Sequence, residues 1–458
     1  MNLKEYLETL KGRTVSVIGI GVSNTPLIEL LCESGCRVIA CDKKSREALG
    51  DTADRLEPLG AALKLGDGYL KDLEPGVVFR TPGMRPDLPE LVEAVQRGAV
   101  LTSEMEAFFE VCPCPIIAVT GSDGKTTTTT IIAELLKKAG KTVHVGGNIG
   151  HPLLAEAGEM GADDIAVLEL SSFQLMTMGK SPHIAVVTNL SPNHLDVHKD
   201  YQEYISAKEN IFTHQSLKDI AVFNADNAVT AEEAGRAVGA VRRFSRKTEL
   251  DEGVFLRDGD IISRHKGQER RVMSVSDIKL PGVHNIENYL AAIAAVEGMV
   301  SDEVIRDFAR SFGGVEHRIE LIRTRNGVRW YNDSIASSPS RTIAGLNSFP
   351  ERVILIAGGK DKGISYEALG PVINEHVKLL LLCGATAGVI RRSVEEAANY
   401  AGLEILDVAD YQEAVSIADQ RSEPGDVVIL SPASTSFDRF ANFMERGRVF
   451  KELVHQLK

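Results

Sequence analysis

A short glycine-rich stretch, Gly121 to Thr127, holds the residues best suited to chemistry. It follows the apolar, β-branched run Ile116–Thr120, which is typical of a buried strand, and it leads into a helical pattern. Backbone N–H groups at such a helix start bind phosphate, Lys125 adds a positive charge, and the Thr126 hydroxyl can reach a Mg²⁺ ion on the phosphates. Val119 stands where the full P-loop pattern has a glycine, so this is the shortened form GxxGKT. We expect a nucleoside triphosphate here; an ordinary turn before a helix is the alternative.

Two further side chains follow predicted strands and are expected at the same sheet edge. Glu169 ends the apolar run that begins at Asp164, and His194 lies in the turn after the run 184–189. The carboxyl ends of parallel strands meet at one edge, and Mg²⁺ prefers carboxylate oxygens. Each residue alone has a plainer interpretation, a solvated strand-end acid or a surface histidine. Together with Lys125 they predict a metal-bearing phosphate site.

Short apolar runs alternate with helical segments along the whole chain, which predicts α/β units with mostly parallel sheets and helices on both faces. Two Asp-Gly or Asn-Gly pairs, Asp258-Gly259 and Asn326-Gly327, predict tight hairpins within this pattern. Three α/β units in series are expected.

The first unit opens with the strand 14–18 and a glycine turn, Gly19 to Asn24, and an acid, Asp42, ends the next strand. This spacing resembles a dinucleotide-binding turn, but Asn24 stands in place of the third glycine. An NAD site and a site for another nucleotide both remain open on these residues. Thr81 follows a further strand at the same expected edge.

Composition excludes several classes of function. The chain has 458 residues, a net charge of −13 and a pI near 5.4, which argues against general nucleic-acid binding. No apolar run approaches the roughly 20 residues of a membrane span, and residues 1–11 lack the apolar core of a signal peptide. The six cysteines suggest free thiols in a reducing cytoplasm, and Cys112-Pro113-Cys114 has the wrong spacing for a CxxC redox pair. The two prolines of the stretch 112–115 cannot lie inside a helix, so this stretch predicts the first domain boundary.

Motifs spread over the whole chain give it a resemblance to a known family. They are 120–127, the Glu-Leu-Ser-Ser-Phe-Gln-Leu stretch 169–175, 189–196, 282–288 and Tyr-Asn-Asp-Ser at 331–334. In this order they resemble the Mur ligases, and within them the branch that adds D-glutamate. The resemblance implies a Rossmann-like domain for a UDP-linked substrate, a central P-loop-type ATP-binding domain, and a Rossmann-like C-terminal domain for the incoming amino acid. The corresponding ranges are 1–112, 113–314 and 315–458.

The resemblance also implies an activity. UDP-N-acetylmuramoyl-L-alanine, D-glutamate and ATP would give the dipeptide-bearing nucleotide, ADP and phosphate. The reaction would pass through an acyl phosphate and would use two Mg²⁺ ions at the site. This reaction is a step of peptidoglycan synthesis, which contributes to cell wall biogenesis, cell shape, cell division and the cell cycle. The resemblance further implies a monomeric cytoplasmic enzyme. We expect no nucleic-acid or membrane partner. A sister ligase for another amino acid, a folylpolyglutamate-type ligase, an oxidoreductase and a non-catalytic nucleotide-binding protein are the alternatives.

Site residues follow from the same resemblance. Lys125, His194 and Lys208 match catalytic positions, and Lys208, which on its own has the pattern of a solvated helix lysine, matches a lysine that carries a carbamate. The metal positions are Thr126, Glu169, His194 and carbamylated Lys208. The ATP positions are Gly121, Ser122, Asp123, Gly124, Lys125, Thr126, Thr127, Asn285, Asn288, Arg318 and Asp333. The substrate positions are Val22, Ser23, Asp42, Lys44, Thr81, Asn148 and Ser171 for the UDP-sugar side, and Ser337, Lys362, Ser436, Phe437 and Phe443 around D-glutamate.

The chain departs from the family pattern at two places. Ile335 follows the Asn-Asp-Ser motif where many members have a lysine, and Lys360 stands where an acid is common, two residues before Lys362. Both lie among the expected D-glutamate contacts, while the ATP and metal residues match throughout. In the first domain, the resemblance assigns the glycine turn to UDP rather than NAD.

Overall fold

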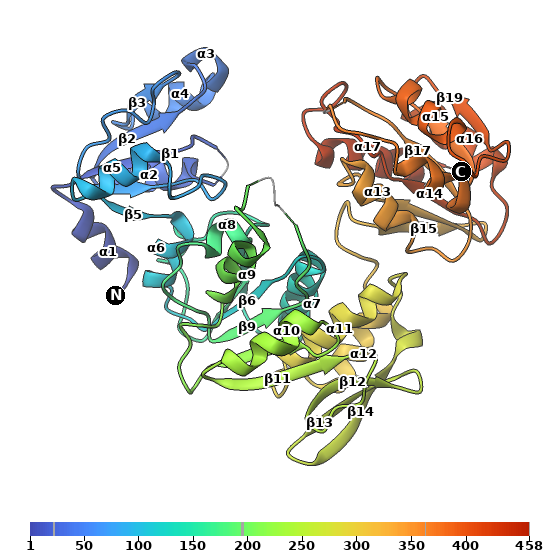
Figure 1. The fold of residues 1–458 in the computed structure, drawn as a ribbon, viewed down its shortest axis with the longest axis horizontal. Helices are drawn as coiled ribbons and strands as arrows, with labels where there is room; N and C mark the ends of the chain where they lie inside the picture. Colours follow the sequence, from blue (N-terminus) through green and yellow to red (C-terminus); the bar gives the residue numbers. More distant parts are fainter. Residues whose placement is uncertain (22, 194–196, 362, 458) are drawn as a thin grey trace. The chain divides into compact units, whose positions relative to one another are not determined.

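The computed structural model describes residues 1–21, 23–193, 197–361 and 363–457. It contains three β-sheets (Figure 1). The chain divides into two compact units, Met1–Val275 with Glu287–Phe308, and Ser276–Ile286 with Ala309–Lys458. The first two sheets belong to the first unit and the third sheet to the second. Each sheet falls inside one of the three expected ranges, and the domain boundaries themselves stay a prediction.

The first sheet is entirely parallel, with the strand order β3-β2-β1-β4-β5. Every residue of β1 is buried, because helices cover both faces of such a sheet. Strand order reverses between β1 and β4, and ligands bind at the carboxyl ends of strands beside such a switch point. The strands are β1 Thr14–Ile18, β2 Arg37–Asp42, β3 Ala62–Leu65, β4 Val77–Phe79 and β5 Val100–Thr102. The helices are α1 Leu3–Leu10, α2 Thr25–Glu33, α3 Arg46–Leu49, α4 Asp51–Leu56, α5 Pro89–Gln96 and α6 Glu104–Val111.

The second sheet has the order β14-β13-β12-β11-β10-β9-β6-β8-β7. It is parallel from β7 to β12, and β12, β13 and β14 extend it as an antiparallel meander. The central strand β6 therefore has β8 on one side and β9 on the other. The strands are β6 Ile116–Thr120, β7 Val143–Gly147, β8 Ile165–Glu169, β9 Ile184–Val187, β10 Ile220–Asn224, β11 Ala240–Ser245, β12 Gly253–Arg257, β13 Asp260–His265 and β14 Gln268–Ser274. The helices are α7 Lys125–Lys138, α8 Ser172–Leu175, α9 Tyr201–Glu209, α10 Ala228–Glu233, α11 Val283–Ala295 and α12 Asp302–Ser311, with short 3₁₀ turns at Ala234–Arg236 and Val275–Asp277.

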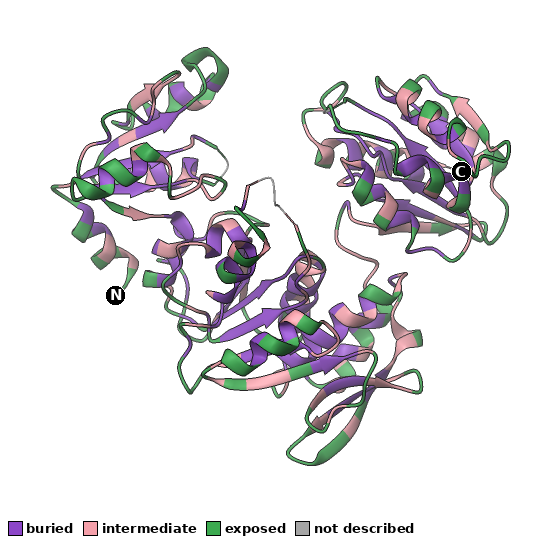
Figure 2. Ribbon diagram, viewed as in Figure 1, coloured by how far each residue is buried: buried purple, intermediate pink, exposed green. Residues whose placement is uncertain are grey.

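The third sheet has the order β15-β16-β20-β17-β18-β19, and only the β15–β16 pair is antiparallel. Alternate residues of β17 enter two separate apolar clusters, so both faces of this sheet are covered. Figure 2 shows its central strands as buried. The strands are β15 Glu320–Arg325, β16 Val328–Asn332, β17 Val353–Ala357, β18 Val377–Leu382, β19 Glu404–Asp407 and β20 Val427–Leu430. The helices are α13 Pro339–Leu346, α14 Leu369–His376, α15 Ala387–Glu395, α16 Tyr411–Arg421 and α17 Phe443–Gln456.

Both predicted hairpins are confirmed. Asp258 and Gly259 join β12 to β13 with φ values of 50° and 82°, and Asn326 and Gly327 join β15 to β16 with 50° and 78°. Positive φ at both central residues defines the type I′ turn, which matches the twist of the flanking strands. In the described ranges, no helix has the length and apolar character needed to cross a membrane.

Candidate active site

The predicted phosphate loop lies between β6 and α7, where sequence analysis placed it. Gly121 has a φ of 151° and Gly124, the residue before α7, a φ of 78°. A Cβ atom at Gly121 would collide with the Thr188 hydroxyl, and one at Gly124 with the Asn288 amide oxygen. Both positions therefore require glycine, for the backbone angle and for the space.

The loop is braced by the segment that follows β9. The backbone N–H of Asp123 donates to the side-chain oxygen of Asn189 at 3.0 Å, and the Thr188 hydroxyl donates to the Asp123 carbonyl at 2.6 Å. The Ser122 hydroxyl bonds to the Ser191 carbonyl and to the Tyr204 hydroxyl, both at 2.9 Å. These bonds fix the loop backbone before any ligand arrives, which is what a preorganised anion site requires.

The Glu169 carboxylate at the end of β8 bonds both the start of α7 and the turn after β7. The Thr126 hydroxyl donates to Glu169 Oε2 at 2.6 Å, and the Asn148 amide donates to Oε1 at 2.7 Å. The Glu169 side chain is almost completely buried. Ligands at right angles around a Mg²⁺ ion are about 2.9 Å apart when each metal–oxygen bond is about 2.05 Å. The Thr126 and Glu169 oxygens are 2.6 Å apart, so they would fit two adjacent positions of a magnesium site if they moved apart by about 0.3 Å.

Two lysines lie against the loop from opposite directions in the sequence. Lys125 Nζ donates to the carbonyls of Gly121 and Ser122, both at 3.0 Å. Lys208 Nζ donates to Thr120 Oγ1 at 3.0 Å and to the Gly121 carbonyl at 2.9 Å. Lys208 is buried, so the expectation of a solvated helix lysine from its own pattern is wrong, and only the resemblance placed it at the site. Burial, and then the charge of Lys125, hold the pKa of Lys208 well below its usual value.

The expected adenine contacts lie on α11. Asn288 is buried, and its side-chain oxygen accepts a bond from the Thr128 hydroxyl at 3.2 Å, beside Gly124. Asn285, one turn earlier, is also buried and donates to the Pro281 carbonyl at 2.6 Å. Asn288 therefore contacts the start of α7, and Thr127 at that start is buried as well.

The first sheet presents its expected residues after β1, β2 and β4. Asp42 accepts bonds from the backbone N–H groups of Ile20 at 2.7 Å and Lys44 at 2.8 Å, so it braces the glycine turn. Ser23 and the Lys44 side chain are exposed, and Thr81 packs against Gly19.

A cavity of about 160 Å³ contains residues from both sheets of the first unit. Ser23 from the glycine turn lines it together with Asn148 and Gln174. Ser171 is not among its lining residues; its hydroxyl caps α8 by accepting the N–H of Gln174 at 3.3 Å. Ser23, which is expected to contact the UDP-linked substrate, and Asn148 therefore line the same cavity. Asn148 also donates a hydrogen bond to Glu169.

In the second unit, Asp333 follows β16 and is buried. Its carboxylate accepts bonds from the Ser431 hydroxyl at 2.8 Å and the Ile319 N–H at 3.3 Å. Burial raises the pKa of Asp333 to about 7, partly opposed by the Ser431 bond and then by the charge of half-buried Arg318. Asp333 and Arg318, both expected ATP residues, are therefore electrostatically coupled.

The expected D-glutamate residues occupy different surroundings. Ser436 is buried, Ser337 and Phe443 are half-buried, and Phe437 is 62% exposed. The Phe443 ring meets the His317 ring edge-on at 5.9 Å. Three other expected site residues, Val22, His194 and Lys362, lie outside the described residues.

Arg446, a fully buried arginine on α17, was not predicted from the sequence. It donates to Ser334 Oγ at 3.0 Å, to the Ser334 carbonyl at 2.8 Å and to the Ser434 carbonyl at 3.0 Å. It thereby joins the loop that holds Asp333 to the loop that holds Ser436. No sequence signal distinguishes it, because arginines on a C-terminal amphipathic helix are usually exposed.

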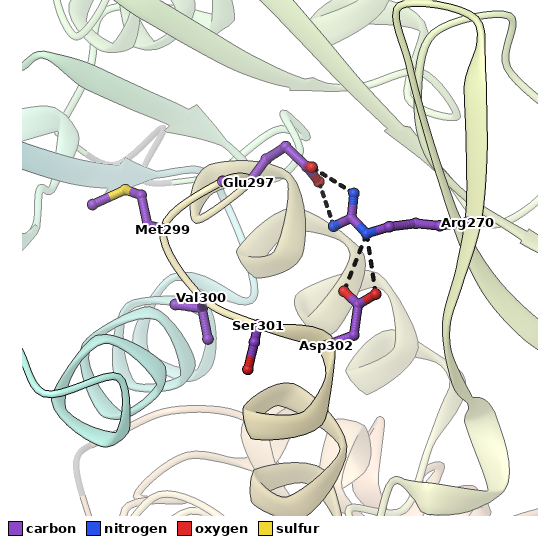
Figure 3. Close-up of a pocket in the computed structure, with 7 residues that line it drawn as sticks. Arg270, Glu297, Met299, Val300, Ser301 and Asp302 are labelled. Atoms are coloured by element: carbon purple, nitrogen blue, oxygen red, sulfur yellow. Dashed lines mark hydrogen bonds and ion pairs between the residues drawn. The ribbon is translucent and has the colours of Figure 1, made fainter.

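A larger hollow of about 390 Å³ lies elsewhere in the first unit, beside the turn between α11 and α12. Figure 3 shows that Arg270 bonds both Glu297 and Asp302 there. The guanidinium and carboxylates of this hollow thus bond one another. None of the expected site residues that the structure describes lines it.

Comparison with known proteins fits this arrangement. A model described as "Mur ligase middle domain" matches residues 119–296, and one described as "Mur ligase, glutamate ligase domain" matches 317–434. The chain is 53% identical over 461 residues to the UDP-N-acetylmuramoylalanine--D-glutamate ligase of Acetivibrio thermocellus, covering 100% of this chain and 99% of that one. The ligase of the same name from Ruminiclostridium cellulolyticum is 52% identical, with the same coverage.

Solved structures share the fold. The UDP-N-acetylmuramate-alanine ligase of Thermotoga maritima superposes with a TM-score of 0.60 at 19% identity, over 97% of this chain and 100% of that chain. A UDP-N-acetylmuramoyl-L-alanyl-D-glutamate--2,6-diaminopimelate ligase gives 0.56 at 19% identity, over 92% and 93%. The full-length identity to the curated ligases, together with the two matching domain models, shows that the chain belongs to the Mur ligase family.

Proposed function

We propose that the chain is an ATP-dependent ligase that joins D-glutamate to UDP-N-acetylmuramoyl-L-alanine in peptidoglycan synthesis. The observation that carries the proposal is the shared contact of Glu169 with Thr126 and Asn148, at 2.6 and 2.7 Å. It joins the expected metal ligands of the phosphate loop to an amide that also lines the cavity beside the glycine turn. Relatives that are about half identical to this chain over their full length are named as D-glutamate ligases. We choose the proposed substrates on the basis of that name.

The proposed reaction has two steps. A carboxylate oxygen of the substrate attacks the γ-phosphorus of ATP, and ADP leaves, which gives an acyl phosphate. The amine of D-glutamate then attacks the carbonyl carbon, phosphate leaves with the C–O bond electrons, and the amine loses a proton. Two anions must meet in the first step, so cations at the loop are needed to stabilise the transition state.

Lys125 supplies one of those cations, and its bonds to two loop carbonyls hold it at the phosphate side of α7. Mg²⁺, when bound, would neutralise phosphate charge, with Thr126 and Glu169 as ligands. His194 is proposed for a second ion by its resemblance to the family position.

Lys208 is proposed to carry a carbamate. A carbamate forms when an unprotonated amine attacks CO₂, and the lowered pKa of this buried amine favours that form. The product would place beside Lys125 an anion able to orient a metal ligand.

The remaining site residues are proposed in three groups. Val22, Ser23, Asp42, Lys44, Thr81, Asn148 and Ser171 would serve the UDP-linked substrate. Asn285, Asn288, Arg318 and Asp333 would complete the ATP site. Ser337, Lys362, Ser436, Phe437 and Phe443 would surround D-glutamate, with Ile335 and Lys360 as departures from the family pattern. A monomeric state and a cytoplasmic location stay predictions.

The test is an amino-acid panel with UDP-N-acetylmuramoyl-L-alanine, ATP and Mg²⁺, scored by phosphate release and product mass. We expect phosphate release and a product heavier by one glutamyl residue only with D-glutamate. Turnover with L-alanine or a diamino acid, and none with D-glutamate, would favour a sister ligase. Turnover with a folate and L-glutamate instead would favour the folylpolyglutamate type, and nucleotide binding without turnover on any substrate would favour the non-catalytic alternative.

A further inference from the structure

Two cysteines face each other in the connection between α6 and β6. Cys112 is the residue that caps α6, Pro113 follows it, and Cys114 lies just before β6. The Sγ atoms of Cys112 and Cys114 are 3.6 Å apart. Cys112 is half-buried and Cys114 is buried, whereas Pro113 between them is exposed. The pair lies at the amino end of β6, and the phosphate loop follows the carboxyl end, so the proposed active site does not contain these thiols.

The backbone conformation at Cys112 and Pro113 favours a disulfide bond between the two sulfurs. Cys112 has φ −60° and ψ 120°, the extended geometry that a following proline favours. The ring of Pro113 restricts the connecting backbone, so little conformational freedom remains to be lost when a small ring closes. A disulfide needs a sulfur separation of about 2.05 Å, so the sulfurs must approach by about 1.5 Å.

The chemistry of the pair differs from that of the other cysteines. All six cysteines are described and free. The hydrogen bond from Cys112 lowers the pKa of Cys114 to about 7, and the same bond raises the pKa of Cys112. Burial raises the pKa of Cys32, Cys36, Cys41 and Cys383. The thiolate is the reactive form, so the pair is the place where a thiolate forms most easily near neutral pH.

We propose that Cys112 and Cys114 form a reversible dithiol–disulfide site that is oxidised by small-molecule disulfides. Cys112 passes its proton to the Cys114 thiolate along the Sγ–Sγ contact, which places the thiolate on half-buried Cys112. That thiolate attacks one sulfur of the small disulfide, a mixed disulfide forms, and one small thiolate leaves. Cys114 then attacks the Cys112 sulfur and releases the second small thiolate. Two cysteine thiols are oxidised, one small disulfide is reduced, and the two thiol protons end on the two small thiols.

The experiment uses the full-length chain, first reduced and then incubated with oxidised glutathione. Acid stops the exchange, the free thiols are then blocked with N-ethylmaleimide in denaturant near neutral pH, where the thiolate forms, and the digest is analysed by mass. We expect two of the six thiols to be lost together, in one peptide that is two hydrogen masses lighter and unlabelled at residues 112 and 114. Dithiothreitol should restore both labels.

Variants separate the proposal from general cysteine oxidation. Cys112→Ser and Cys114→Ser should each abolish the light peptide, and the remaining thiol should be left free or bear a single glutathione. Cys32→Ser is the matched control, because Cys32 and Cys36 are also close in sequence, and it should leave the light peptide unchanged. A wild-type peptide that keeps both labels while other cysteines react would overturn the proposal, as would a link from Cys112 to a different cysteine. Turnover is not measured, so the outcome is independent of the proposed ligase activity.

Discussion

Replacing Glu169 by glutamine tests the geometry at the centre of the proposed site. The substitution keeps the side-chain shape but removes the charge and leaves a single acceptor oxygen. Glu169 now accepts from both Thr126 and Asn148, so one of these donors loses its partner in the variant or faces an amide N–H₂ group. The substitution also removes a carboxylate that fits Mg²⁺ ligation.

The magnitude follows from the bonds lost. A hydrogen bond to a charged group contributes about 1.5–3 kcal/mol. Every 1.36 kcal/mol of transition-state stabilisation is a factor of ten in rate. Loss of one such bond during turnover therefore predicts a fall in kcat/KM of about 10- to 150-fold. Loss of a metal ligand adds a requirement for more Mg²⁺.

The assay is phosphate release from ATP with both other substrates, followed as a function of Mg²⁺ concentration. The half-saturating Mg²⁺ concentration should rise in Glu169→Gln. Glu134→Gln is the matched control, since Glu134 pairs with Lys137 on the exposed side of α7 and undergoes the same chemical change. A fall below about threefold in Glu169→Gln, with an unchanged Mg²⁺ dependence, would refute the assignment of Glu169 to the metal.

Three further outcomes are expected. Thorough removal of bicarbonate should lower turnover and its return should restore it, if buried Lys208 carries a carbamate; the measurement is the rate under CO₂-free gas with and without added bicarbonate. Burial raises the pKa of Asp333 to about 7, so the folded protein binds a proton that the unfolded chain has released. Stability should therefore fall as pH rises from about 4 to 7, and urea unfolding should show a shallower fall in Asp333→Asn. Arg446→Lys cannot reproduce all three bonds of the buried guanidinium and should lower the free energy of unfolding by about 1–3 kcal/mol, measured by denaturant titration.

Each of these outcomes has a result that would contradict it. Turnover that is indifferent to bicarbonate would count against the carbamate at Lys208. An unchanged pH slope in Asp333→Asn would show that another group causes the wild-type slope. Arg448→Lys, an exposed arginine on the same helix, is the control for Arg446, and equal stability losses in the two variants would remove the special role of Arg446.

The parts of the site that depend on local chemistry were predictable from the sequence. Gly121 and Gly124 have positive φ values that the short phosphate loop imposes locally, and the turn at Asn326-Gly327 is similarly local. The side chains of Thr188 and Asn288, which also leave no space for a Cβ atom at these glycines, come from distant segments. The approach of Glu169 to Thr126, 43 residues apart, was predictable in kind, because both follow parallel strands that end at one edge.

Other parts depend on packing that no single segment specifies. Lys208 has the local pattern of an exposed helix lysine, yet α9 packs its amine beneath the loop, against Thr120 and the Gly121 carbonyl. Arg446 is buried because two loops from different strands of the third sheet converge on α17. A hydrophobic pattern predicts which face of a helix is buried, but not which polar groups its neighbours will place there.

The strand order of the second sheet explains how the proposed phosphate loop is held from both sides. Because β6 lies between β8 and β9, the loop after it is braced by Asn189 on the β9 side and meets Glu169 on the β8 side. The two lysines then differ in a useful way. Lys125 begins α7 and is half-buried, whereas burial and then the charge of Lys125 disfavour the charged form of Lys208. The unprotonated amine is the form that reacts with CO₂, so the burial of Lys208 favours the carbamate that we propose for it.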